Sequence, residues 1–123
     1  MNVVDSSGWL EYFANGVNAA FFAPAIEEID KLIVPTIILY EVFKRIYQQR
    51  SEEDALQAVA HMQQGTVIDV DSTLALEAAR ISADEKIPMA DSLILATAQR
   101  HQATLWTQDV DLQNFPNVRY VAK

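Results

Sequence analysis

The sequence predicts an α/β sandwich built around a mainly parallel sheet of about four or five strands. Two observations predict this fold class. Short apolar runs of strand type alternate along the chain with longer segments whose apolar residues recur every three or four positions. Strands that alternate with helices in this way belong to parallel sheets, because parallel strands need crossover connections. The chain has 123 residues without a repeat or a linker, so we expect a single domain over residues 1–123.

The first half of the chain supplies two strands and three helices. The expected elements are a strand over residues 2–4, a helix through residues 9–13, a helix over 19–30, a strand over 32–34 and a helix over 37–49. Asn15-Gly16 is a helix-ending pair that stops the first helix. Pro24 either kinks the second helix or marks a later start. Pro35 closes the second strand, and Thr36 is the expected N-cap of the third helix.

The second half of the chain supplies three strands and three more helices. The expected elements are a helix from 51 to 64, a strand over 66–70, a helix from 72 onward, a helix over 89–98, and strands over 104–107 and 118–121. Ser51 and Asp54 resemble a capping box, and Asp71 with Ser72 caps the next helix. The apolar residues expected to face inward are Leu56, Val59, Ala60 and Met62 on the first helix, and Leu74, Leu76, Ala78, Ala79 and Ile81 on the second.

The helix over residues 89–98 is expected to be buried, since Met89, Leu93 and their neighbours recur at helical spacing among small residues. Pro88 suits its entry point. Asp91 lies in its first turn, and a carboxylate among apolar residues is costly unless something pairs with it. One interpretation is that Asp91 complements the helix dipole, which contributes about 0.3–1 kcal/mol. The other is a functional role shared with further carboxylates.

The charge balance limits the classes of partner. Seventeen acidic residues against nine basic ones give a net charge of −8. This argues against nucleic acid, because phosphate affinity comes mainly from Lys and Arg. Divalent cations among clustered carboxylates weaken that objection, and a basic partner protein is an alternative. The sequence has no cysteine, no signal-peptide pattern and no apolar run of membrane-spanning length, so we expect a cytoplasmic setting and no membrane association.

Four carboxylates occupy comparable places in the predicted fold. Asp5 ends the first strand, and Asp109 follows the strand at residues 104–107. Glu41 lies in the helix after the second strand, and Asp91 starts the buried helix. Binding sites of parallel sheets lie beyond the carboxyl ends of the strands, so we expect these four side chains to converge on one edge. The alternatives are helix N-caps for Asp5 and Asp109 and a solvated position for Glu41.

Carboxylates gathered in this way predict a divalent metal site. Like charges within a few ångströms repel, by about 4 kcal/mol for a close pair at an effective dielectric of about 20. Mg²⁺ and Mn²⁺ take carboxylate and water oxygens as ligands. The chemistry expected of such a cluster is metal-assisted hydrolysis of phosphodiester bonds, with a metal-activated water as the nucleophile.

Four motifs can be set in order along the whole chain. They are Asp5-Ser6-Ser7, Glu41 following Pro35, Ala90-Asp91-Ser92-Leu93-Ile94, and Leu105-Trp106-Thr107-Gln108-Asp109-Val110-Asp111. This ordered set resembles the PIN domain and, more narrowly, the VapC-type toxins of bacterial type II toxin–antitoxin pairs. The resemblance implies a PIN-like three-layer α/β/α sandwich and a metal-dependent endoribonuclease that a cognate antitoxin inhibits. It also implies a homodimer, and a groove between the early helices that takes the antitoxin's C-terminal segment.

The resemblance extends to individual residues. Asp5, Asp91 and Asp109 match acids expected to hold Mg²⁺ or Mn²⁺, and Glu41 matches one that assists a second ion or orients the attacking water. Supporting positions are matched by the hydroxyls of Ser6 and Thr107, with Asp111 as a secondary candidate, whereas Leu112 stands where the family often has an aromatic residue.

Two basic residues are predicted to contact RNA. Lys44 and Arg45 follow Glu41 by three and four positions, so at least one shares its helix face. The alternative is that both are solvated surface residues. Trp9, Tyr12 and Phe13 recur at helical spacing beside apolar residues, so we expect them in the core or at a partner interface rather than stacked on bases.

Two other function classes are alternatives to the nuclease. A receiver-type phosphoacceptor domain needs paired acids after the first strand and a lysine partner, and Asp5 has no acidic neighbour. A catalytically inert PIN-like module that binds RNA or protein is the second alternative. The presence of all four acids argues against lost catalysis, so we predict an RNA-cleaving enzyme.

Overall fold

The computed structural model describes residues 1–123 and contains one five-stranded sheet. The strands are β1 (Asn2–Val4), β2 (Leu32–Pro35), β3 (Thr66–Ile68), β4 (Thr104–Thr107) and β5 (Val118–Tyr120). Their order across the sheet is β3-β2-β1-β4-β5, and every neighbouring pair is parallel. The predicted α/β class and parallel sheet are therefore confirmed.

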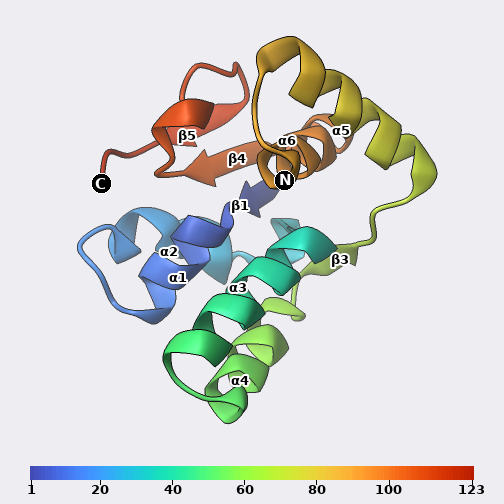
Figure 1. Cartoon of the computed structure of the whole chain (residues 1–123). Coiled ribbons are helices and arrows are strands. Elements are labelled where there is room, and N and C mark those ends of the chain that lie inside the picture. Colours follow the sequence, from blue (N-terminus) through green and yellow to red (C-terminus); the bar gives the residue numbers. More distant parts are fainter.

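Six α-helices connect and cover these strands. They are α1 (Ser6–Phe13), α2 (Ala19–Glu27), α3 (Thr36–Gln49), α4 (Glu52–Met62), α5 (Ser72–Glu85) and α6 (Met89–Arg100), with short 3₁₀ turns at Ile29–Lys31 and Val110–Leu112. Helix α6 contacts β1, β4, α3 and α5, whereas α2 packs on β1 and α1. In Figure 1 the α3–α4 pair extends from the sheet toward the bottom of the view, and α5 and α6 lie on the opposite side. This arrangement is the predicted α/β/α sandwich.

The strand order places a switch point beside β1. The chain leaves β1 toward β2 and β3 on one side and then returns to form β4 and β5 on the other. Connections therefore leave β1 and β4 in opposite directions, which opens a crevice at their carboxyl ends. The residues that follow these two strands are Asp5 and Gln108-Asp109.

The core confirms the expectation of a buried final helix, with one exception. Ile94, Leu95 and Ala98 of α6 are fully buried in the main hydrophobic cluster. Met89, which the spacing predicts to be buried, is 70% exposed. Met89 is the first residue of α6, where the chain enters the helix from the surface, so its side chain has no layer above it to pack against.

Two helices bury only some of the residues that the sequence predicted to face inward. Leu56 on α4 and Leu76 on α5 are 54% and 69% exposed, and Ala60 and Ala79 are exposed as well. Met62 on α4 and Leu74 and Ala78 on α5 are buried as predicted, and Ala55 and Ala58 on α4 are buried as well. The small alanines allow α4 to approach α3, and α5 to approach α6, closely.

Several predicted boundaries also need correction. Pro35, still part of β2, is the N-cap of α3, and Thr36 is its first helical residue and not its cap. Helix α2 contains Pro24 and ends at Glu27 instead of residue 30. Strand β3 ends at Ile68 because its partner strand β2 ends at Pro35, opposite it in the register.

The predicted helix caps at Ser51 and Asp71 are confirmed. Ser51 Oγ accepts a hydrogen bond from the Asp54 backbone N–H at 3.1 Å, and Asp71 Oδ1 accepts one from Leu74 at 2.8 Å. The reciprocal half of the capping box is absent, since Asp54 instead accepts a hydrogen bond from Arg50 Nε at 2.9 Å.

None of the helices combines the length and apolar composition needed to cross a membrane.

Candidate functional site

Asp5 lies at the centre of the sheet's carboxyl edge. Its backbone N–H donates to the carbonyl of Trp106 at 2.9 Å, which ties the end of β1 to β4. Its buried carboxylate accepts hydrogen bonds from the Ser6 backbone N–H at 2.8 Å, from Ser7 Oγ at 3.1 Å and from Thr107 Oγ1 at 2.8 Å. Asp5 is therefore the N-cap of α1, which is the alternative role that the sequence allowed for it. Donors from α1 and β4 hold its carboxylate in one orientation.

Burial has the largest effect on the pKa of Asp5. Burial raises this pKa, and the hydrogen bonds from Thr107, Ser7 and Ser6 lower it without cancelling the effect of burial. The charge of Asp109 raises the pKa of Asp5 further. The two carboxylates that follow β1 and β4 therefore lie within electrostatic reach of one another.

Thr107 joins those two carboxylates. Its hydroxyl donates to Asp5 and accepts a hydrogen bond from the Asp109 backbone N–H at 2.9 Å. Asp109 Oδ1 in turn accepts from the Asp111 backbone N–H at 2.9 Å, which caps the 3₁₀ turn after β4. Asp109 is half-buried and Asp111 is exposed. One buried hydroxyl thus fixes the relative position of two strand ends.

Asp91 lies in the first turn of α6 and faces the same group of acids. Its pKa is raised to about 7, first by burial and then by the charges of Asp5, Asp109, Glu41 and Asp111. No side-chain hydrogen bond caps α6, so Asp91 does not act as a helix cap. Asp91 therefore lies within electrostatic reach of the three other predicted acids and of Asp111.

Glu41 approaches the group from α3. Burial raises its pKa, the Ser6 hydroxyl lowers it, and the charge of Asp5 raises it. Glu41 Oε1 is buried and has no hydrogen-bond partner. A buried carboxylate oxygen without a partner is costly, and either a proton or a cation relieves that cost.

The donor set fits a hard divalent cation. Every candidate donor is a carboxylate or hydroxyl oxygen, the kind of ligand that Mg²⁺ and Mn²⁺ take. The unpaired oxygen of Glu41 and the strongly raised pKa of Asp91 both mark charge that a cation would stabilise. In the structure, no three acidic or histidine side chains are placed closely enough to hold one metal ion together.

Two cations lie beside Glu41, where the sequence predicted them. Lys44 and Arg45 line a hollow of about 350 Å³ together with Ser6, Tyr40 and Glu41. Neither cation forms a salt bridge, whereas Arg50 pairs with Asp54, and Arg100 with Asp71 and Glu77. Lys44 and Arg45 therefore keep their charge available to a ligand.

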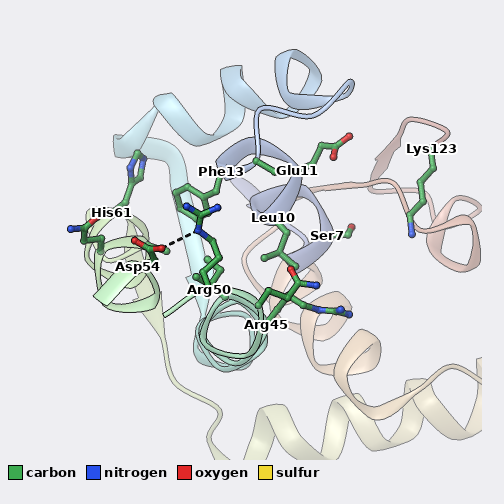
Figure 2. Close-up of a pocket in the computed structure, with 14 residues that line it drawn as sticks. Ser7, Leu10, Glu11, Phe13, Arg45, Arg50, Asp54, His61 and Lys123 are labelled. Carbon is green, nitrogen blue, oxygen red and sulfur yellow. Dashed lines mark hydrogen bonds and ion pairs between the residues drawn. The ribbon is translucent and has the colours of Figure 1, made fainter. Parts of the chain in front are cut away.

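A larger groove of about 1040 Å³ runs between α1, α3 and α4. Figure 2 shows Leu10 and Phe13 on one side of it and Arg45 and Arg50 on the other, with His61 of α4 at one end. The His61 ring meets Phe13 edge to face, with ring centroids 5.5 Å apart. Trp9, which the sequence placed in the core or at an interface, is fully buried beneath this groove's apolar side.

Sequence reasoning missed two residues that organise the site. Ser7 donates to Asp5, and Gln108 accepts a hydrogen bond from Asn18 Nδ2 at 3.0 Å and donates to the Ser7 carbonyl at 3.5 Å. Gln108 thereby connects the turn after β4 to the segment before α2. Ser7 had a detectable signal, a second hydroxyl directly after Asp5-Ser6, whereas Gln108 had none because its partners are distant in sequence.

The fold was compared with solved structures. A toxin–antitoxin complex from Klebsiella pneumoniae contains a chain of similar fold, with a TM-score of 0.79, 21% identity and coverage of 97% of this chain and 96% of that one. A chain of the Rickettsia felis VapBC2 complex bound to a promoter DNA fragment has a TM-score of 0.74 at 13% identity, and the match covers 98% of this chain and 97% of that one. The Mycobacterium tuberculosis sarcin–ricin loop cleaving toxin VapC20 has a TM-score of 0.75 at 15% identity, and the match covers 97% of this chain and 99% of that one.

Sequence comparisons identify the family. No curated protein sequence matches the chain. The family model described as PIN domain matches residues 3–118, from β1 through the first residue of β5, and so includes all four acids of the carboxyl edge. The chain belongs to the PIN domain family.

Proposed function

We propose that this protein is a metal-dependent endoribonuclease of the VapC toxin type, acting in the cytoplasm. The observation that carries the proposal is the group of four acids at the carboxyl edge, where Asp91 has a pKa of about 7 because of burial and the charges of its neighbours. Perturbed titratable groups gathered in one crevice are typical of catalytic sites. The solved toxins of similar fold, one of them described as cleaving the sarcin–ricin loop, support RNA as the substrate.

The acids have distinct parts in the proposed mechanism. Asp5, Asp91 and Asp109 would hold Mg²⁺ or Mn²⁺, and Glu41 would orient the attacking water or support a second ion. A bound ion of this kind lowers the pKa of water and stabilises charge on the reacting phosphate. Asp91 must lose its proton to bind, since about half of it is protonated near pH 7.

Neighbouring residues hold these acids and the substrate. The Thr107 hydroxyl fixes Asp5 relative to Asp109, and Ser6 lies between Asp5 and Glu41. Lys44 and Arg45 would contact phosphates that flank the cleaved bond. Attack by water in this arrangement is expected to leave a 5′-phosphate and a 3′-hydroxyl.

RNA cleavage tests the function. The full chain is incubated with an RNA pool in Mg²⁺ or Mn²⁺, alongside the Asp91→Asn and Asp5→Asn variants and an Asp84→Asn control on the exposed side of α5. We expect cleavage by the wild type and the control, and a loss of about a hundredfold or more in both site variants. Undiminished cleavage by both site variants would rule out this assignment of the site.

We further propose that a cognate antitoxin blocks the enzyme through the groove between α1, α3 and α4. The groove is mixed in character, with Leu10 and Phe13 beside Arg45 and Arg50, and it begins next to Ser7 at the site itself. An extended peptide segment with apolar and acidic side chains would match it. Co-expression with the product of an adjoining small gene should suppress cleavage, and unchanged cleavage would contradict this partner.

A homodimer is the remaining part of the proposal. Val70, Leu76 and Met89 leave large apolar side chains exposed at or near α5 and the start of α6. Such a surface is suited to a second copy of the chain. Sedimentation of the purified chain should give a dimer that Leu76→Asp weakens, and a monomer at every concentration would contradict it.

A further inference from the structure

We propose that an exposed aromatic groove on α3 binds the bases of single-stranded RNA next to the candidate cleavage site. This inference rests on the proposed ribonuclease function and deepens it. The aromatic groove is lined by Leu39, Tyr40, Phe43, Lys44, Tyr47 and Val59. It is separate from the groove between α1, α3 and α4, whose lining shares none of these residues.

The rings of the aromatic groove are arranged for stacking. Phe43 and Tyr47 lie nearly parallel, with ring centroids 5.8 Å apart and an interplanar angle of 19°. Tyr47 is 54% exposed and Tyr40 is 60% exposed. A flat base can therefore lie against either tyrosine. Each base stacked on an aromatic side chain strengthens single-strand binding about five- to hundredfold.

The charge of the aromatic groove favours a polyanion over an apolar protein segment. The Lys44 ammonium lies 5.7 Å from the centroid of the Tyr40 ring, and neither Lys44 nor the neighbouring Arg45 pairs with a carboxylate. An apolar helix docking here would bury Lys44 without a partner, which is costly. RNA supplies both a flat ring for the aromatic side chains and a phosphate for the ammonium.

The aromatic groove continues into the candidate site. Tyr40 and Lys44 line both this groove and the hollow that contains Glu41 and Ser6. From Tyr40 to Tyr47 the helix rises about 10 Å, which matches about three steps of a stacked strand at roughly 3.4 Å each. A strand whose phosphate reaches Glu41 can thus place its next bases along α3, so these side chains would influence which RNA sequence is bound.

Base-dependent binding tests the aromatic groove. Fluorescence anisotropy is measured with a labelled oligoadenylate and with an oligomer of the same length in which abasic riboses replace the central nucleotides. Every protein carries Asp91→Asn to prevent cleavage, and Mg²⁺ is present. The variants are Tyr40→Ala, Tyr47→Ala, Tyr47→Phe and Lys44→Ala. The control is Ile29→Ala, an exposed apolar residue in the 3₁₀ turn before β2.

We expect Tyr40→Ala and Tyr47→Ala to weaken binding of oligoadenylate about five- to hundredfold and to leave the abasic oligomer almost unaffected. Tyr47→Phe and Ile29→Ala should bind as the parent does. Lys44→Ala should weaken both oligomers and reduce the salt dependence by about one phosphate contact.

Three results would overturn the inference. If the wild type cleaves RNA but the tyrosine variants bind both oligomers like the parent, the aromatic groove is not a base-binding surface and the proposed function stands. If the tyrosine variants instead change sedimentation of the chain and leave RNA binding intact, the groove is a protein interface. If the wild type neither cleaves nor binds RNA, the proposed function and this inference fail together.

Discussion

The carboxyl group of Asp91 shows how position sets chemistry at the scale of one residue. The positive end of α6 favours its ionised form, but burial and the charges of Asp5, Asp109, Glu41 and Asp111 oppose ionisation more strongly. The result is a carboxyl group that titrates near neutral pH. A group of this kind exchanges its proton for a cation over the physiological range.

Asp91→Asn is expected to stabilise the protein in the absence of divalent metal. Because the pKa of Asp91 is about 7 in the fold and near 3.8 in the unfolded chain, ionisation favours unfolding. The penalty is absent below the unfolded pKa, grows as pH rises between the two values and is complete above about 7. After discounting for solvent screening, we expect a gain of about 1–2 kcal/mol at pH near 8 and less near pH 5.

Urea unfolding in EDTA measures this gain. Asp84→Asn, on the exposed surface of α5, is the matched control and should change stability little at either pH. A stability loss in Asp91→Asn, or a gain independent of pH, would show that Asp91 does not bear the electrostatic cost described.

Sequence reasoning could find the charged residues of the site but not all of their partners. Asp5 and Asp109 were predictable because each follows a strand, and Glu41 because it lies in the helix that follows another strand. The buried unpaired oxygen of Glu41 and the contacts of Gln108 were not, since they depend on side-chain distances between elements far apart in the chain.

At the scale of an element, helix α1 depends on a close contact at Gly8. A Cβ on Gly8 would lie 2.6 Å from Phe22 Cε1 and 2.8 Å from Val4 Cγ1, both in the buried core. Glycine therefore lets α1 pack tightly on α2 and β1. The same packing keeps Asp5, just before α1, at the carboxyl edge.

Gly8→Ala is expected to destabilise the protein by about 1–3 kcal/mol, because neither neighbour can move without disturbing the core. Gly16→Ala is the comparison, since its new Cβ would meet the flexible end of Glu11 and the loss should be smaller. Thermal unfolding measures both variants. Equal effects would mean that α1 is not held by the Gly8 contact.

The existence of each helix was predictable, whereas the set of buried residues on α4 and α5 was predictable only in part. Apolar residues on these helices occupy more than one face, so periodicity alone allows either Leu56 or Ala55 to point inward. The structure buries the alanines because the neighbouring helices lie close. Large residues such as Leu76 are left exposed, where they can contact another chain.

For the molecule as a whole, strand order decides which residues meet. The sequence predicted alternating strands and helices, but the order β3-β2-β1-β4-β5 depends on pairings between distant segments. The convergence of the four acids was predicted from the fold class, because binding sites of parallel sheets lie at the carboxyl ends of the strands. The net charge of −8 remains compatible with RNA because Lys44 and Arg45 lie unpaired beside Glu41.

Calorimetric titration with Mn²⁺ tests the central claim that the acids form one cation site. The wild type and Asp84→Asn should bind, with affinity rising between about pH 6 and about pH 8 as Asp91 loses its proton. Asp5→Asn and Asp91→Asn should weaken binding about tenfold or more. If the wild type takes up no Mn²⁺, or if both site variants bind it equally well, the chain is an inert PIN-like module and the account is contradicted.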